Sequence, residues 1–245
     1  YSGSRKTSVT DALHTAEKML KEGASILDIG GLSTRPGAAS VTAQEETERI
    51  LPLIEAITRE FPASFLSVDT YSSVVARTAV EHGAVIINDI SGGLFDDKML
   101  ATVAALQVPY VCMHLKGTPE TMHADPQYAD VTKEVLDYFI ERTAVCTKAG
   151  INDVIIDPGF GFSKNSTHNF QLFKQLEVFT MLKRPLLLGI SRKSTIYKTL
   201  GITAEEALNG TTVLNTAGLL KGASILRVHD VKEAMEAIRL VSFIK

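Results

Sequence analysis

Apolar runs of strand length recur along the chain, and each ends in a polar or charged residue next to a glycine or a break. Between most of these runs lies a segment in which apolar residues follow helical spacing. The runs predict seven strands, near residues 25–28, 65–69, 85–89, 109–114, 154–157, 185–190 and 224–228. Strands that alternate with helices in this way are typical of an α/β protein with a parallel sheet.

The segments between the runs carry helical signals of two kinds. Two of them have apolar residues on one helical face: Val9, Leu13, Ala16 and Leu20 in one, and Ile50, Leu53, Ile54 and Ile57 in the other. Three begin with the residues of a capping box: Thr42 with Glu45, Thr203 with Glu206 and, as a variant, Asp230 with Glu233. We therefore expect helices to begin at these points.

The order of these elements predicts a TIM barrel, the (β/α)8 fold, as a single domain over residues 1–245. The chain opens with a helix and continues with seven strand–helix units, so we expect the first strand and its loop to be missing from this numbering. The alternative is an open seven-stranded sheet, which would leave a strand edge unpaired. In a barrel the carboxyl ends of all strands lie on one rim, where catalytic residues gather.

Composition narrows the functional classes. Of the 245 residues 45% are hydrophobic, which fits a globular protein with a large core, and the net charge of −3 argues against general nucleic-acid binding. The apolar runs fall short of the roughly 20 residues that span a bilayer. Only two cysteines, Cys112 and Cys146, occur, and we expect both to be reduced in a cytoplasmic protein. A mitochondrial location would follow if a targeting segment preceded Tyr1.

Polar side chains at three strand ends suggest a binding site for a flat heterocycle. A carboxylate accepts two adjacent donors, and an amide matches a donor–acceptor pair, so Asp69, Asn88 and Asp157 together suit an amino-pyrimidinone edge. Each could instead cap the helix that follows its strand. Asp28 and Asp89 are weaker candidates, as helix caps or as supports for these residues.

Glycine-rich loops follow two of these strands. Residues 30–37 contain Thr34 and Arg35 between glycines, which suggests a lid that brings a hydroxyl and a cation to an anion. An ordinary strand–helix connection is the alternative. In the loop after Asp157, we expect Phe162 to stack on a flat ligand and Phe160 to belong to the core.

Cations cluster after the last two strands, where barrels often bind phosphate. Arg192 and Lys193 follow the sixth run, and a solvated basic turn is the alternative there. Arg227 and His229 lie two residues apart, hence on one side of a strand, just before a helix N-terminus that favours anions. We interpret this pair as a diphosphate site.

Other chemistry remains open at a few positions. Lys193 could form a Schiff base, as in barrel aldolases. His114 and His123 have no evident metal partner and are interpreted as structural. We name no metal ligand in this sequence.

Taken together, six ordered motifs resemble the dihydropteroate synthases. They span nearly the whole chain: Asp28–Gly31 with Ser33–Gly37, Ser67–Thr70, Ile87–Asp89, Asp157–Phe162, Ser191–Ser194 and Arg227–Asp230. The resemblance implies a TIM barrel that condenses 7,8-dihydropterin-6-ylmethyl diphosphate with 4-aminobenzoate in folate biosynthesis. Diphosphate would leave before the amine attacks, with Mg2+ as cofactor.

The resemblance also implies a role for each matching residue. The catalytic residues would be Arg35, Asp69, Asp157 and Lys193. The pterin would be bound by Asp69, Asn88, Asp157 and Lys193, in a slot lined by Met113, Phe162 and Gly189. The diphosphate would be bound by Arg35, Arg227 and His229. The 4-aminobenzoate would lie near Thr34, Pro36 and Ser194, with Arg192 supporting that wall.

The family further implies a homodimer, sensitivity to sulfonamides, and in some lineages fusion to other folate enzymes. Leu32 stands where bacterial members usually carry Glu, and the family's magnesium-binding Asn would lie on the missing first strand. Two alternatives remain: a pterin-binding methyltransferase barrel that uses methyl-tetrahydrofolate, and a non-catalytic scaffold barrel. Neither needs the cations of the last two loops.

Overall fold

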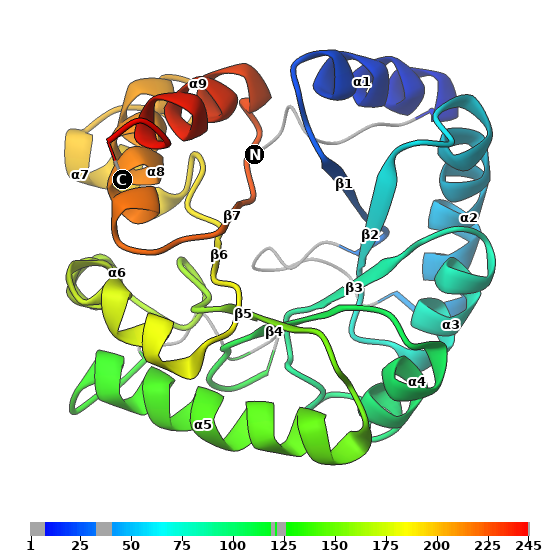
Figure 1. Cartoon of the computed structure of the whole chain (residues 1–245), viewed down its shortest axis with the longest axis horizontal. Coiled ribbons are helices and arrows are strands. Elements are labelled where there is room, and N and C mark those ends of the chain that lie inside the picture. Colours follow the sequence, from blue (N-terminus) through cyan, green and yellow to red (C-terminus); the bar gives the residue numbers. More distant parts are fainter. Residues whose placement is uncertain (1–7, 33–40, 119–120, 122–125, 245) are drawn as a thin grey trace. The chain divides into compact units, whose positions relative to one another are not determined.

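The computed structural model describes residues 8–32, 41–118, 121 and 126–244 (Figure 1). The strands are β1 (Ile26–Gly30), β2 (Phe65–Asp69), β3 (Ile86–Asp89), β4 (Tyr110–Met113), β5 (Val154–Asp157), β6 (Leu187–Leu188) and β7 (Ile225–Leu226). The helices are α1 (Val9–Lys21), α2 (Ala43–Glu60), α3 (Ser73–Glu81), α4 (Met99–Leu106), α5 (Val131–Ala149), α6 (Ser166–Lys174), the 3-10 helix η2 (Leu176–Leu182), α7 (Ser194–Leu200), α8 (Leu208–Leu220) and α9 (Val231–Val241). All seven predicted strands are confirmed.

The chain forms two compact units, which we describe one at a time. Of the described residues, the N-terminal unit contains 8–113 and 142–155, and the C-terminal unit contains 114–141 and 156–244. The boundary crosses α5 and β5. The single domain expected from the sequence stays a prediction.

Parallel strands form the core of the N-terminal unit, in the order β1, β2, β3, β4 and then the start of β5 (Figure 1). The ladders place Gly30 opposite Asp69, and Asp69 opposite Asn88. The carboxyl ends of three consecutive strands are therefore aligned. Leu66, Val68 and Ile87 are almost fully buried, as expected for parallel strands covered by helices.

The helix α2 shows how its sequence fixes its position. A full capping box at Thr42 and Glu45 starts it, as predicted. Ile50, Ile54 and Ile57 are buried, and they form the apolar face that the spacing predicts. The face of α1 was predicted less well, because Ala12 and Ala16 are its buried residues while Val9 is 39% exposed.

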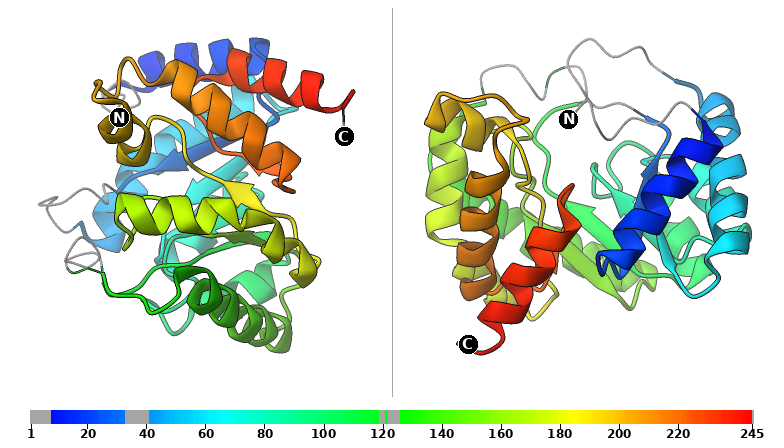
Figure 2. Two further views of the ribbon diagram at one scale, coloured as in Figure 1. Left: turned by 90° about the vertical axis from the view of Figure 1, so that its left-hand side faces the viewer. Right: turned by 90° about the horizontal axis from the view of Figure 1, so that it is seen from above.

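Short strands characterise the C-terminal unit. Ile156 at the end of β5 bridges to Leu186, and β6 pairs with β7 through Leu187 and Ile225. The helices α8 and α9 lie side by side, as both views show (Figures 1 and 2). Helix α8 approaches β6 closely, because a Cβ on Gly218 would overlap the Leu188 side chain.

The other two predicted capping boxes do not cap an α-helix in the way that Thr42 and Glu45 cap α2. Thr203 and Glu206 do exchange hydrogen bonds, but they cap a turn that precedes α8, which begins at Leu208. The helix start predicted at Asp230 is confirmed, since Asp230 is the N-cap residue of α9, but the predicted capping bond of its side chain is absent. Its carboxylate instead binds Arg192, at 2.8 and 2.9 Å, and a bidentate guanidinium is the stronger partner.

We expect Gly218→Ala to destabilise the protein, although alanine favours helix. The added methyl would collide with the buried Leu188, and overpacking of this kind typically costs about 1–3 kcal/mol. Urea denaturation would measure the loss. Val213→Ala, at an exposed position of the same helix, is the control and should change the free energy of unfolding by less than about 0.5 kcal/mol. Equal stability of the two variants would contradict the close approach.

Candidate active site

The aligned strand ends of the N-terminal unit place polar side chains together. Asn88 is buried, and its Nδ2 donates to Asp28 Oδ2 at 3.2 Å. Asp69 ends the neighbouring β2 and is half-buried. Asp28 is therefore a support for Asn88, which is one of the two roles that the sequence left open for it.

The helix-cap alternative fails for these residues. The side chain of Ser72 caps α3, which follows Asp69, and α4 has no side-chain cap. Asp89 is instead fully buried and holds the loop after β3, since it accepts from Ser91, Gly93 and the Tyr110 hydroxyl at 2.6–2.8 Å. Burial raises the pKa of Asp89 despite these donors.

Glu46 is a buried acid of α2 that the sequence analysis missed. It is 1% exposed, and its Oε1 has no hydrogen-bond partner among the described residues. Burial raises its pKa to about 7, a hydrogen bond from Thr70 opposes this, and the charge of Asp69 adds to it. The signal was available, because Glu46 lies one turn before Ile50 on the apolar face of α2.

In the C-terminal unit, Asp157 begins a tight turn. Its Oδ1 accepts the Gly159 N–H at 2.8 Å, and its carbonyl accepts the His114 N–H at 2.9 Å. Gly159 has a φ of +70°, and a Cβ there would overlap the His114 carbonyl oxygen. Only glycine satisfies both conditions, so the backbone itself fixes the Asp157 carboxylate.

Lys193 lies beside this turn. Its Nζ donates to the Phe160 carbonyl and stands 4.5 Å from the centroid of the Phe162 ring. A Cβ on Gly189 would lie 3.8 Å from Asp157 Oδ2 and 3.9 Å from Lys193 Nζ, so Gly189 borders both groups. Phe160 is fully buried, as predicted, whereas Phe162 is half-buried.

Opposing effects act on the pKa of Asp157. Burial raises its pKa, while the charges of Lys193, Arg227 and Lys164 and the Gly159 N–H lower it. The net pKa remains raised. A carboxylate among three cations is suited to accept hydrogen bonds from a neutral donor edge.

The loop after β6 and the loop between β7 and α9, which the sequence analysis predicted to bind phosphate, are joined by hydrogen bonds. Arg192, whose φ is +53°, pairs with Asp230 and donates to the carbonyls of Ala204 and Glu205. Ser191 Oγ accepts the His229 N–H at 3.2 Å. Arg192 is thus engaged within the protein, which suits the supporting role that the family resemblance implies better than a direct substrate contact.

Of the predicted diphosphate pair, Arg227 is exposed and His229 half-buried. Burial lowers the pKa of His229, the positive charges of Arg227 and Arg192 contribute, and the charge of Asp230 opposes them. The imidazole is therefore neutral at pH 7 in the protein as described. It offers an anion a hydrogen-bond donor, while Arg227 supplies the charge.

The remaining predicted residues are placed as follows. Met113 is buried at the end of β4, and Ser194 is the half-buried first residue of α7. Thr34, Arg35, Pro36 and His123 lie outside the described residues. Asp69, Asn88 and Met113 belong to the N-terminal unit, and the other described site residues to the C-terminal unit.

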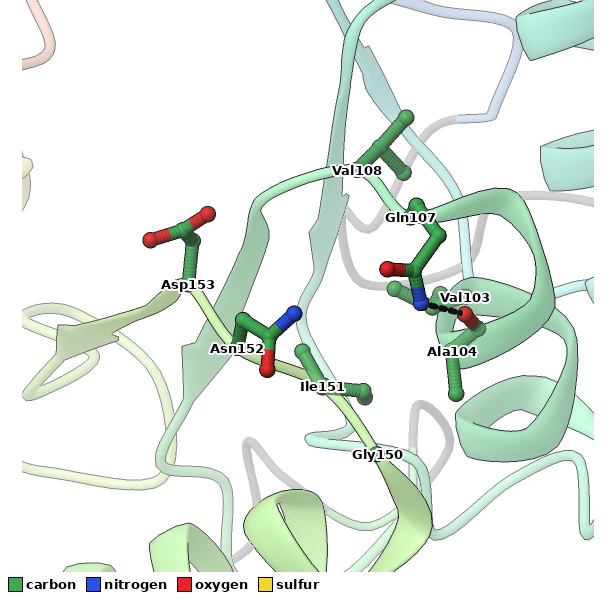
Figure 3. A pocket seen from close by; sticks show the side chains of 8 residues that line it. All are labelled: Val103, Ala104, Gln107, Val108, Gly150, Ile151, Asn152 and Asp153. Carbon is green, nitrogen blue, oxygen red and sulfur yellow. Dashed lines mark hydrogen bonds between the residues drawn. The ribbon is translucent and has the colours of Figure 1, made fainter.

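A small cavity lies at the opposite ends of the strands. It is lined by residues before β4 and before β5, among them Gln107 and Asn152 (Figure 3). Its volume of about 20 Å³ suits a single water molecule. It is too small for a substrate and is not part of the candidate site.

In the described part of the chain, no group of three or more His, Cys, Asp or Glu residues is arranged to hold a metal ion. Within the same ranges, no helix combines the length and the apolar character needed to span a membrane.

Comparison with known proteins decides the family. The pterin binding enzyme family profile matches residues 1–229. Dihydropteroate synthase from Escherichia coli is 44% identical over 98% of this chain and 85% of its own length. The folic acid synthesis protein fol1 of Schizosaccharomyces pombe is 40% identical over the whole chain, which covers 34% of that longer protein.

A solved structure agrees with these relatives. Dihydropteroate synthase from Xanthomonas albilineans with 4-aminobenzoic acid has a TM-score of 0.91 and 38% identity, covering 99% of this chain and 87% of that one. The chain belongs to the dihydropteroate synthases of the pterin-binding enzyme family. The family resemblance and the α/β TIM-barrel class inferred from the sequence are thus confirmed, and the chain is a transferase.

Glu46 makes the stability of this dihydropteroate synthase depend on pH. Its carboxyl ionises near pH 4.5 in the unfolded chain and near 7 in the folded one, so the folded state binds more protons between these values. The free energy of unfolding attributable to Glu46 therefore falls as pH rises from about 4.5 through 7, by about 2–3 kcal/mol. Glu46→Gln should remove this fall.

Urea denaturation at pH 4.5 and at pH 8 provides the measurement. The variant should match the wild type at pH 4.5 and exceed it at pH 8. Glu48→Gln, at an exposed position of the same helix, is the control and should follow the wild type. A variant that is less stable than the wild type at pH 8 would show that Glu46 is not the buried titrating acid.

Proposed function

We propose that the chain joins 7,8-dihydropterin-6-ylmethyl diphosphate to 4-aminobenzoate and releases 7,8-dihydropteroate and diphosphate. The observation that supports this most directly is the arrangement of Asp157, Gly189, Lys193 and Phe162 in one unit. It combines a buried two-acceptor carboxylate, a position without a side chain, a cation and an aromatic ring, which are what a flat amino-pyrimidinone requires.

In this proposal Asp157 accepts two donors of the pterin ring, and Lys193 donates to a ring acceptor. The position of Gly189 leaves space against both groups, and Phe162 offers a face for stacking. Asp69, Asn88 and Met113 are further pterin contacts by family resemblance. Thr34, Pro36 and Ser194 are proposed for 4-aminobenzoate on the same ground, and Arg192 supports that wall through Asp230.

Diphosphate is proposed to bind Arg227, His229 and Arg35. Helix α9 begins directly after His229 and has no side-chain cap, so its first N–H groups are placed to favour an anion. His229 would donate from a neutral ring. An arriving diphosphate would then raise its pKa and favour proton uptake.

The reaction is proposed to be dissociative, because a neutral aromatic amine is a poor nucleophile. Stabilising the departing diphosphate then supplies most of the acceleration. The positive charge left on the pterin methylene would be delocalised into the ring. Since Asp157 is surrounded by cations, its main contribution is to hold the ring rather than to offset that charge.

Magnesium is proposed to enter with the diphosphate. The described residues form no metal cage, and Mg2+ commonly keeps several waters and binds through substrate phosphates. It would neutralise diphosphate charge. The protein groups that orient the leaving group remain Arg227 and His229, together with Arg35.

A homodimer in the cytoplasm is proposed for the assembled enzyme. Large apolar side chains are exposed at the end of α8, on α9 and at the end of the chain, namely Leu220, Leu240, Phe243 and Ile244. Such an apolar surface suits a subunit interface. Both cysteines are buried and neither forms a disulfide, which fits a reducing compartment.

The two other classes of function are less well supported. A methyltransferase that uses methyl-tetrahydrofolate would share the pterin contacts but would have no use for the paired cationic loops. A scaffold barrel would not need the buried Asp157. The curated relatives favour neither.

Mixing the purified protein with both substrates and Mg2+ should release diphosphate, and a sulfonamide should inhibit this in competition with 4-aminobenzoate. A coupled phosphate assay after pyrophosphatase treatment measures the release. Methyl transfer without diphosphate release would favour the methyltransferase, and no activity toward either substrate pair would favour the scaffold.

Asp157→Asn should weaken pterin binding about tenfold or more, because the amide replaces one acceptor by a donor and leaves a pterin donor unpaired. Calorimetric titration with a pterin that lacks the diphosphate measures the affinity. Asp153→Asn is the matched control, since Asp153 is exposed just before the same strand. Unchanged pterin affinity in Asp157→Asn would remove this residue from the pterin site.

A further inference from the structure

Lys164 is a buried lysine for which the proposed reaction has no use. It lies between the turn after Asp157 and Asn165, the N-cap residue of α6, and is 8% exposed. Lysines are rarely buried unless they are paired, because removing an ammonium from water is costly. A buried lysine at this place therefore calls for a reason.

Its contacts use every hydrogen of the ammonium. Lys164 Nζ donates to the carbonyls of Gly159 and Phe162, each at 3.2 Å, and to His114 Nδ1 at 2.9 Å. A charged lysine has three N–H donors and no acceptor, so donors and acceptors match in number. The neutral amine has two N–H groups, so its contact with His114 would need the other tautomer of the imidazole, and none of its hydrogen bonds would be charge-assisted.

His114 is suited to be the third acceptor. It is 4% exposed, and its ring meets the Tyr138 ring edge-on at 4.9 Å. Burial lowers the pKa of His114, and the charge of Lys164 adds to this, so the imidazole is neutral. With Nδ1 accepting from Lys164, the ring proton lies on Nε2.

The turn that Lys164 holds is unusual in its backbone. Gly159, Gly161 and Ser163 have φ values of +70°, +79° and +45°. Two lysines bind carbonyls of this one turn: Lys164 binds those of Gly159 and Phe162, and Lys193 binds that of Phe160. The position of the Phe162 ring and that of the Lys193 ammonium thus depend on the same short segment.

We propose that Lys164 is a positioning residue for the pterin: its ammonium, bonded to Gly159, Phe162 and His114, fixes the turn that places Phe162 and Lys193. This inference rests on the proposed function, because it assumes that these two residues contact the pterin. Lys164 itself does not touch the substrate.

A dependence on pH follows. Burial lowers the pKa of Lys164 to about 7; the charge of Asp157 raises it, and that of Lys193 lowers it. These are the charged groups that act on it, and His114 is neutral. As pH rises through about 7 the ammonium loses a proton and its hydrogen bonds lose their charge assistance, so pterin affinity should decrease.

The test compares Lys164→Met with Lys221→Met. Methionine keeps the length and apolar stem of lysine but not its charge. Lys221 is the control because it makes comparable contacts on the surface. Its Nζ donates to the Lys174 carbonyl and to the Glu177 carboxylate. Calorimetric titration with a pterin that lacks the diphosphate, at pH 6 and pH 8.5, gives the affinities, and steady-state assays give the KM of each substrate.

At pH 6 the Lys164→Met variant should bind pterin about tenfold more weakly than the wild type, as expected for the loss of charge-assisted bonds. Its KM for 4-aminobenzoate should change less than about twofold, and its difference from the wild type in pterin affinity should be smaller at pH 8.5, where the wild-type bonds are no longer charge-assisted. A merely structural role would change both KM values together. Lys221→Met should behave as the wild type at both pH values.

The outcomes separate the two proposals. A wild type that binds no pterin overturns the proposed function. A wild type that binds pterin, with a folded Lys164→Met variant of equal affinity at both pH values, overturns the role of Lys164 alone. If that variant does not fold, the wild type decides, because pterin affinity that stays constant from pH 6 to pH 8.5 also overturns it.

Discussion

A carboxylate removed from water needs compensating charge, and the C-terminal unit is organised around that need at Asp157. Its partners come from four separate segments: the Gly159 N–H from its own turn, Lys164 from the start of the next helix, Lys193 from the loop after β6 and Arg227 from the loop after β7. The burial that raises the pKa of the acid also lowers that of Lys164. The groups of the proposed pterin site are thus held together by the same interactions that stabilise the buried carboxylate.

The ion pair between Arg192 and Asp230 likewise fixes two loops, the one after β6 and the one between β7 and α9. Because Asp230 binds the guanidinium, it does not cap α9, and the helix end is left for an anion. Because Arg192 is bound, it is not available as a general phosphate cation. This ion pair therefore gives Arg192 and Asp230 a structural role, while the proposed ligand contacts of these loops are made by Arg227 and Lys193.

The strands and the polar residues at their ends could be predicted from the sequence. Apolar runs predicted all seven strands, and the polar residues at their ends predicted the alignment of Asp69 with Asn88 in the N-terminal unit. That Asp157 shares a site with these two residues stays a prediction. The cap at Asp230 was mispredicted, since a local pattern cannot reveal a partner 38 residues away. Glu46 and Lys164 were missed for a related reason: a charged residue is ordinarily assumed to face water, and its burial depends on tertiary neighbours.

The close approach at Gly159 couples substitutions in two loops, the one after β5 and the one after β4. The His114 carbonyl occupies the space that any side chain at position 159 would need. A substitution at 159 would first require the segment after β4 to move, and such a move would also shift His114 away from Lys164. Substitutions in one loop, for instance those selected by an inhibitor, are therefore constrained by the backbone of the other loop. Sequence variation should accumulate more readily at residues outside these two loops.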